Sequence, residues 1–198
     1  MTTLTHDFHD GRGPVPAHQH LYGGGWVADS AHVDASVRVT GDALVYGNAR
    51  VTGDAQVYGN AQVSGDAQVS GNAQVTGNAR VTGDAQVYGN ARVSGDAQVS
   101  GDAQVSGNAW VSGNALVESQ ADFLIVGPVG SRGDYLMMVR DSKLGIRVST
   151  GCFSGSWAEF RARVEATYPD ATKGHGQSYR LLAAEMYATL SQRIKDQT

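Results

Sequence analysis

The sequence predicts a mostly β protein, in which a parallel β-helix of about five coils is followed by a small α+β domain with two helices. The first observation is a repeat of six residues, with valine at every sixth position from Val33 to Val117. The second is a Gly-Asp or Gly-Asn pair before each strand position, which marks a corner because both residue types tolerate a bent backbone. The third is the loss of the period at Ala121, where the composition also changes.

The period of six residues predicts a solenoid, because a short fixed repeat is the signature of a chain that stacks one unit on the next. It matches neither a helix nor a heptad, so a coiled coil is excluded. In each unit valine points inward and its two neighbours point outward, since side chains alternate along a strand. The alanine near the corner also points inward, where only a small side chain fits. We expect Val45, Val63, Val81 and Val99 to form one internal column.

The repeat resembles the hexapeptide-repeat family, in which an aliphatic residue is followed four positions later by a small residue. This resemblance implies a left-handed parallel β-helix with triangular coils, in which residue n lies beneath residue n+18. The outward residues then form three flat, mostly uncharged faces, on which stacked Gln side chains can hydrogen-bond along the axis. The position after valine holds Ser, Thr or Tyr here, where the family more often has Gly, and we expect it to face solvent.

We divide the chain into an N-terminal cap (residues 1–28), a repeat domain (29–121) and a C-terminal domain (122–198). An uncovered strand edge at the end of a solenoid invites aggregation, so we expect residues 21–26 to form a lid on the first coil.

Histidines in the N-terminal cap raise the question of a metal site. His18 and His20 could lie on one side of a strand, but no Cys or carboxylate at ligand spacing completes a site. We therefore expect a polar cap and no metal, and the sequence leaves metal binding by these two histidines open.

Three strands are predicted at the start of the C-terminal domain. Residues 123–126 have the pattern of a buried strand, closed by Gly127-Pro128. Residues 135–139 and 144–148 predict a hairpin around the turn 141–143.

Two helices are predicted to follow. Ser156 and Glu159 form a capping box that begins a helix, and Pro169 ends it. The inward face of this helix carries Trp157, Phe160, Val164 and Tyr168 at spacings of three and four. A Gly-rich loop over residues 173–177 precedes a second helix over 178–195, with Tyr179, Ala183, Met186, Tyr187, Leu190 and Ile194 inward.

The C-terminal domain resembles a module of uncharacterised phage and prophage proteins that also follows hexapeptide-type repeats. The resemblance lies in residues 123–127, residues 146–153 and the capped helix. It implies a phage or prophage context and a bacterial cytoplasmic location, with a virion component as an alternative, and it carries no assigned chemistry.

Composition excludes several classes of function. The net charge of −4 argues against a nucleic-acid binder. No apolar run approaches the roughly 20 residues that span a membrane. The single cysteine, Cys152, excludes an internal disulfide framework and suits a cytosolic protein.

Candidate catalytic residues are few, and each has a simpler interpretation. Cys152 and His175 share a domain, but a Cys followed by Phe between a strand and a helix is more often a buried small residue. His32 is the one histidine of the repeat region, at an outward position, and we interpret it as a solvated surface residue. We therefore expect no enzymatic activity and no cofactor.

The preferred hypothesis is a non-enzymatic scaffold that binds a protein partner, such as a host or defence factor that it inhibits, through its C-terminal domain. We also expect a homo-oligomer, a dimer or a trimer, and no nucleic-acid or membrane partner. The alternatives are an acetyl-CoA-dependent acyltransferase of the hexapeptide family and a tail component of a virion. Trp110 is expected to be buried against the C-terminal domain. The candidate interface residues are Tyr58, Trp110, Leu116, Phe153, Trp157, Tyr179 and Tyr187.

Overall fold

The structure is a computed structural model that describes residues 4–130, 132–170 and 174–197. The chain divides into two compact units, Met1–Gly113 and Asn114–Thr198. Each unit is described by itself.

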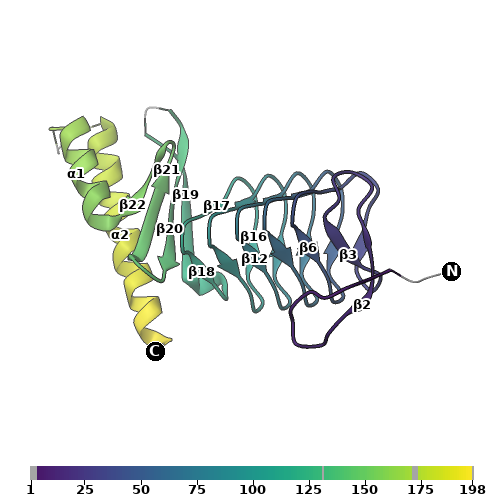
Figure 1. Ribbon diagram of the computed structural model, residues 1–198. Coiled ribbons are helices and arrows are strands. Elements are labelled where there is room, and N and C mark those ends of the chain that lie inside the picture. Colours follow the sequence, from purple (N-terminus) through teal and green to yellow (C-terminus); the bar gives the residue numbers. More distant parts are fainter. Residues whose placement is uncertain (1–3, 131, 171–173, 198) are drawn as a thin grey trace. The chain divides into compact units, whose positions relative to one another are not determined.

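The first unit is a parallel β-solenoid of five coils, whose short strands stack into three sheets (Figure 1). This confirms the predicted fold class. One sheet contains β3 (Trp26–Ala28), β6 (Leu44–Val45), β9 (Gln62–Val63), β12 (Arg80–Val81) and β15 (Gln98–Val99). The second contains β4 (His32–Val33), β7 (Arg50–Val51), β10 (Gln68–Val69), β13 (Gln86–Val87) and β16 (Gln104–Val105). The third contains β5 (Arg38–Val39), β8 (Gln56–Val57), β11 (Gln74–Val75), β14 (Arg92–Val93) and β17 (Trp110–Val111).

The valines form the predicted internal columns. Val45, Val63, Val81 and Val99 pair in register from coil to coil, and all four are fully buried. The coils are joined by backbone hydrogen bonds of 2.8–3.1 Å that repeat with the hexad, so the strands are paired along the axis. The solenoid core is thus a stack of valine and alanine layers held by parallel ladders.

The corners combine a left-handed glycine with a ladder of amides. Gly65 has φ +72°, and a Cβ at this position would lie 2.9 Å from the backbone nitrogen of Gly83 in the next coil. Next to the glycines, Asn60 donates to Asn78 at 2.9 Å and Asn78 donates to Asp96 at 2.9 Å. The corner Asn and Asp residues therefore form a side-chain ladder along the axis, which was not predicted from the sequence.

The residue after each valine is less exposed than expected. Ser64, at such a position, is buried. The prediction that this position faces solvent is wrong for Ser64, because its short side chain lies between the longer Tyr46 and Thr82 of the adjacent coils.

The first coil is covered by an N-terminal hairpin as well as by the expected lid. Strand β1 (Thr5–His6) pairs antiparallel with β2 (Val15–Gln19), which pairs antiparallel with β3. Phe8 is buried against Tyr46 beneath this hairpin. Of the expected lid, Gly25 hydrogen-bonds to Val39, but Leu21 is 87% exposed. The cover of the first coil is therefore larger than the predicted lid of residues 21–26, because β2 pairs with the open edge of β3.

The second unit begins with the strand β18 (Leu116–Val117) and the short helix η1 (Gln120–Asp122). An antiparallel sheet follows, in the order β19-β20-β21-β22. Its strands are β19 (Phe123–Val129), β20 (Asp134–Asp141), β21 (Gly145–Thr150) and β22 (Phe153–Ser156). The two helices are α1 (Trp157–Thr167) and α2 (Gly174–Asp196). The three predicted strands, the hairpin and the two helices are confirmed, with two main changes of boundary, whereas the fourth strand, β22, was not predicted.

In both cases the strand or helix is longer than predicted and includes glycine residues that were expected to lie outside it. Strand β19 continues past Gly127-Pro128 to Val129 with an irregular register, so the pair does not close the strand. Helix α2 already begins at Gly174, which means that residues 174–177 are helical and not a loop. Lys173 of the predicted loop lies outside the described residues.

Candidate functional site

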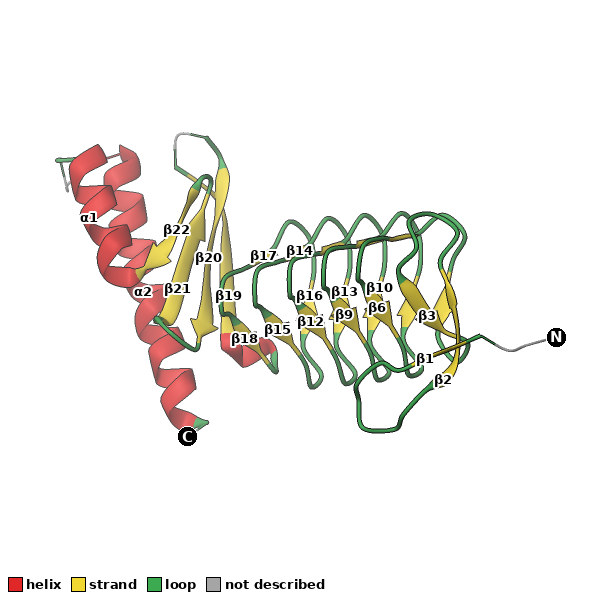
Figure 2. Cartoon of the chain, in the orientation of Figure 1, coloured by secondary structure: helices red, strands yellow, loops and turns green. Residues whose placement is uncertain are grey.

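Helices α1 and α2 lie on the same face of the four-stranded sheet and enclose the core of the second unit (Figure 2). The helix faces were predicted from their spacing, and Phe160, Val164, Ala183, Met186 and Leu190 are buried as expected. The core positions α1 beside the end of β22. Its buried residues are Val129, Leu136, Met138, Ile146, Val148, Phe160, Val164, Ala183, Met186 and Leu190.

The predicted capping box fixes where α1 begins. The backbone N–H of Glu159 donates to Oγ of Ser156 at 3.3 Å, and the N–H of Ser156 donates to Oε2 of Glu159 at 2.7 Å. The hydrogen bonds from the Ser156 backbone and hydroxyl lower the pKa of Glu159. Because the cap residue is also the last residue of β22, the strand and the helix are joined without a loop.

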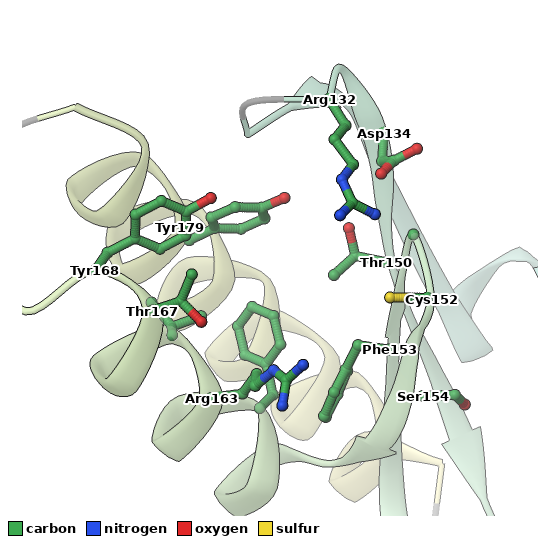
Figure 3. Close-up of a pocket in the computed structure, with 13 residues that line it drawn as sticks. Arg132, Asp134, Thr150, Cys152, Phe153, Ser154, Arg163, Thr167, Tyr168 and Tyr179 are labelled. Carbon is green, nitrogen blue, oxygen red and sulfur yellow. The ribbon is translucent and has the colours of Figure 1, made fainter.

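A cleft of about 480 Å³ opens beside this junction, within the second unit (Figure 3). Its walls are the loop before β20, the turn between β21 and β22, the outer half of α1 and the first turns of α2. Its volume lies within the range of about 300–1,000 Å³ that is typical of ligand sites. The lining residues are Arg132, Asp134, Thr150, Gly151, Cys152, Phe153, Ser154, Phe160, Arg163, Val164, Thr167, Tyr168 and Tyr179.

Two guanidinium groups enter the cleft from different walls. Arg132 comes from the loop before β20 and Arg163 from α1 (Figure 3). Neither forms an ion pair with any carboxylate in the part of the chain that the structure describes. The one carboxylate of the lining, that of Asp134, lies over Gly151, where a Cβ would be 2.7 Å from Oδ2. The charged groups of the cleft therefore comprise two cations and one anion.

Aromatic rings form the inner surface of the cleft. The ring centroids of Tyr168 and Tyr179 are 6.1 Å apart, and Phe160 meets Tyr179 edge to face at 6.1 Å. Phe153 lies 5.7 Å from Phe160, so the rings are continuous from α2 to β22. Beneath Arg132 in Figure 3, the hydroxyl of Thr150 is buried without a hydrogen-bond partner among the described residues. The cleft thus combines an apolar aromatic floor with cationic groups.

The candidate interface residues fall into separate groups. Phe153 and Tyr179 line the cleft. Trp157 and Tyr187 stack on each other at 4.7 Å, and Trp157 lines a second, smaller cavity beside α1. Leu116 is half-buried in β18, at the start of the same unit.

The remaining two candidates, Tyr58 and Trp110, lie on the third sheet face of the solenoid. Trp110 is 41% exposed, and its Nε1 donates to Oγ of Ser94 at 3.1 Å. The prediction that Trp110 is buried is wrong, because its ring lies along the outer face of the solenoid beside Ser94. It lines a shallow groove there with Asn72, Gln74, Asn90, Arg92 and Asn108.

Cys152 is also placed differently from the expectation. It is exposed and lines the cleft, whereas a Cys before Phe153 was interpreted as buried. The reason is that Gly151 and Cys152 form the turn between β21 and β22, so strand alternation does not apply to Cys152. His175 lies at the start of α2 against the ring of Tyr168 and does not line the cleft.

Sequence reasoning missed the two arginines of the cleft. Arg132 and Arg163 are ordinary exposed cations in the sequence, and no spacing links them. Tyr168 was predicted only as an inward residue of a helix face. In the structure it lies at the end of α1 and lines the cleft.

The histidines of the first unit have individual partners. His18 lies 2.9 Å from Asp29, and His32 lies 3.1 Å from Asp34. His20 is buried, which lowers its pKa, and accepts a hydrogen bond from the backbone of Tyr22. Over the described ranges, no three His, Cys, Asp or Glu residues are grouped so that they could hold a metal ion. In the same part of the chain, no helix is long and apolar enough to cross a membrane.

Comparison with known proteins finds a similarity in the repeats. Residues 43–59, 55–71, 67–83, 85–101 and 103–119 match the YdcK β-solenoid repeat. These segments cover less than half of the chain and do not extend into the sheet and helices that carry the cleft. No curated protein and no solved structure matches the chain. The similarity therefore agrees with a solenoid scaffold.

Proposed function

We propose that the protein is a non-enzymatic scaffold, in which the solenoid is a rigid spacer and the C-terminal unit binds a protein partner. The observation that carries the proposal is the cleft, in which aromatic side chains converge with two arginines that have no ion-pair partner among the described residues. Aromatic residues and Arg are enriched at the centres of protein interfaces, where they supply most of the binding energy. The solenoid faces, in contrast, repeat small polar and amide side chains, which supply little driving force for association.

We further propose that the chain is encoded by a phage or prophage and acts in the bacterial cytoplasm on a host protein, as an inhibitor of a host or defence factor. The support for this context is the resemblance of residues 123–127 and 146–153 to a phage module.

A homo-oligomer is also proposed, and Leu181 on α2 supports it because this large apolar side chain is 64% exposed.

The proposed function can be tested by affinity isolation from bacterial host lysate with the full chain and two matched variants. Thr167→Trp places a large uncharged side chain at the exposed wall of the cleft, and Gln68→Trp places the same group on an exposed solenoid face. We expect one protein to be enriched by the wild type and by Gln68→Trp, and to be lost with Thr167→Trp. Loss with Gln68→Trp and retention with Thr167→Trp would place the interface on the solenoid and reject the proposal.

A further inference from the structure

We propose that the C-terminal cleft recognises an acidic peptide segment, in which a carboxylate lies beside an aromatic or aliphatic side chain. This inference rests on the proposed function, because it names the chemistry of the partner segment that the cleft binds. Two features of the cleft lead to it: its uncompensated charge and its aromatic floor.

Three other arginines of this unit form ion pairs with carboxylates. Arg147 pairs with Asp141 at 2.7 Å, Arg140 with Glu118 at 3.3 Å, and Arg161 with Glu165 at 3.9 Å. Arg132 and Arg163 have no such partner among the described residues, and both line the cleft. A guanidinium group offers planar N–H donors that match a carboxylate, so two free guanidinium groups favour an anionic ligand.

The floor of the cleft shows that the ligand is more than a small anion. Phe153, Phe160 and Val164 line the cleft together with the two arginines. A single small anion would occupy a minor part of a cleft of about 480 Å³ and would leave these side chains in water. Burial of apolar surface contributes about 25 cal/mol per Å², so a ligand with an apolar side chain next to its carboxylate gains from both features.

The position of the cleft favours a peptide over a small metabolite. The cleft is open to solvent, and Cys152 and Thr167 on its rim are exposed. Sites for small molecules enclose roughly 70–90% of the ligand surface, which this open shape does not do. Strand β22 is the last strand in the order β19-β20-β21-β22, and extended peptides commonly bind beside such an edge strand.

The test is fluorescence anisotropy of the full chain with two labelled peptides. One carries the sequence Asp-Phe-Asp-Leu and the other has Asn in place of both Asp residues, with blocked ends in each. We expect the acidic peptide to bind at least about tenfold more tightly than the amide peptide, as charge-assisted hydrogen bonds require. Phenylacetate, which has the same carboxylate and ring chemistry without a backbone, is expected to compete only weakly.

Matched variants locate the binding. Arg132→Gln and Arg163→Gln are each expected to reduce the affinity for the acidic peptide at least about fivefold while leaving the amide peptide unaffected. Arg161→Gln lies on the same helix but outside the cleft, and we expect it to bind as the wild type does.

Three results would overturn the inference. They are equal affinity for both peptides, an equal loss with Arg161→Gln, and competition by phenylacetate as strong as by the peptide, which would indicate a small-molecule site. These results are separate from the test of the proposed function. If Thr167→Trp abolishes capture of the partner but acidic and amide peptides bind alike, the cleft is an interface of different chemistry.

Discussion

Arg147 donates from Nε to Oδ2 of Asp141 at 2.7 Å, and this ion pair holds the turn between β20 and β21. The other carboxylate oxygen accepts hydrogen bonds from the backbone N–H groups of Lys143 and Leu144, each at 2.9 Å. Burial alone would raise the pKa of Asp141, but these two backbone hydrogen bonds and the guanidinium group of Arg147 outweigh it and lower the pKa. The turn predicted at residues 141–143 is therefore stabilised by its own first side chain.

This lowered pKa predicts how the stability of the protein depends on pH. The pKa of Asp141 is lower in the folded than in the unfolded chain. The ionised carboxylate therefore stabilises the fold at pH values above the unfolded pKa, and this stabilisation is lost as the pH falls through the folded pKa. At pH 7 we expect Asp141→Asn to reduce the free energy of unfolding by about 2 kcal/mol, the value of hydrogen bonds to a charged group. Urea denaturation should show that the loss shrinks as the pH falls from about 5 to about 2. Asp102→Asn, at an exposed position, is the control. If Asp141→Asn reduced the free energy of unfolding equally at every pH, the lowered pKa of Asp141 would be contradicted.

The corner glycines predict a difference between two substitutions to alanine. Gly65 and Gly107 both have positive φ, so both variants carry the backbone strain of about 1–2 kcal/mol. At Gly65 the new Cβ would also meet Gly83 at 2.9 Å, whereas at Gly107 no atom lies within 4 Å. We expect Gly65→Ala to lower the melting temperature more than Gly107→Ala does. Equal melting temperatures would show that the coils are more loosely stacked than described.

The valine columns predict the effect of a buried charge. Val81 is fully buried between Val63 and Val99, so Val81→Asp should unfold the solenoid, since an unpaired buried carboxylate costs several kcal/mol. Arg80→Asp, at the adjacent outward position, should keep the circular dichroism spectrum of the wild type. A folded Val81→Asp variant would mean that the inward assignment is wrong.

The proposed oligomer can be examined through two exposed leucines. Leu181 on α2 is 64% exposed and Leu21 in the N-terminal cap is 87% exposed. If the C-terminal unit holds copies together, light scattering of the full chain should give a dimer or trimer that Leu181→Ser weakens and Leu21→Ser does not. A monomeric wild type at micromolar concentration would contradict the proposed oligomer.

The solenoid could be predicted from the sequence because each hexad has nearly the same environment as the next. The residue at the valine position therefore faces the same core in every coil, from Val39 to Val111. Most of the secondary structure of the second unit could also be predicted, since the cap at Ser156 and the helix spacing are local signals. Strand β22 was missed because the residues Phe153–Ser156 carry no run of β-branched or aromatic side chains.

The cleft could not be predicted, because it depends on tertiary packing. It brings together Arg132 from a loop, Cys152 from a tight turn and Arg163 from a helix surface, and no local pattern links them. The exposure of Cys152 has the same cause, since a turn and not strand alternation determines where its side chain points.

The central claim is that the partner binds at the C-terminal cleft, and site-specific photocrosslinking tests it most directly. Cys152 is the single cysteine of the chain and is exposed in the cleft, so a benzophenone maleimide can be attached there alone. The matched control carries the same group on the solenoid through Gln68→Cys combined with Cys152→Ser. We predict a covalent adduct with the captured protein from position 152 and none from position 68. An adduct from position 68 with none from position 152 would contradict the claim.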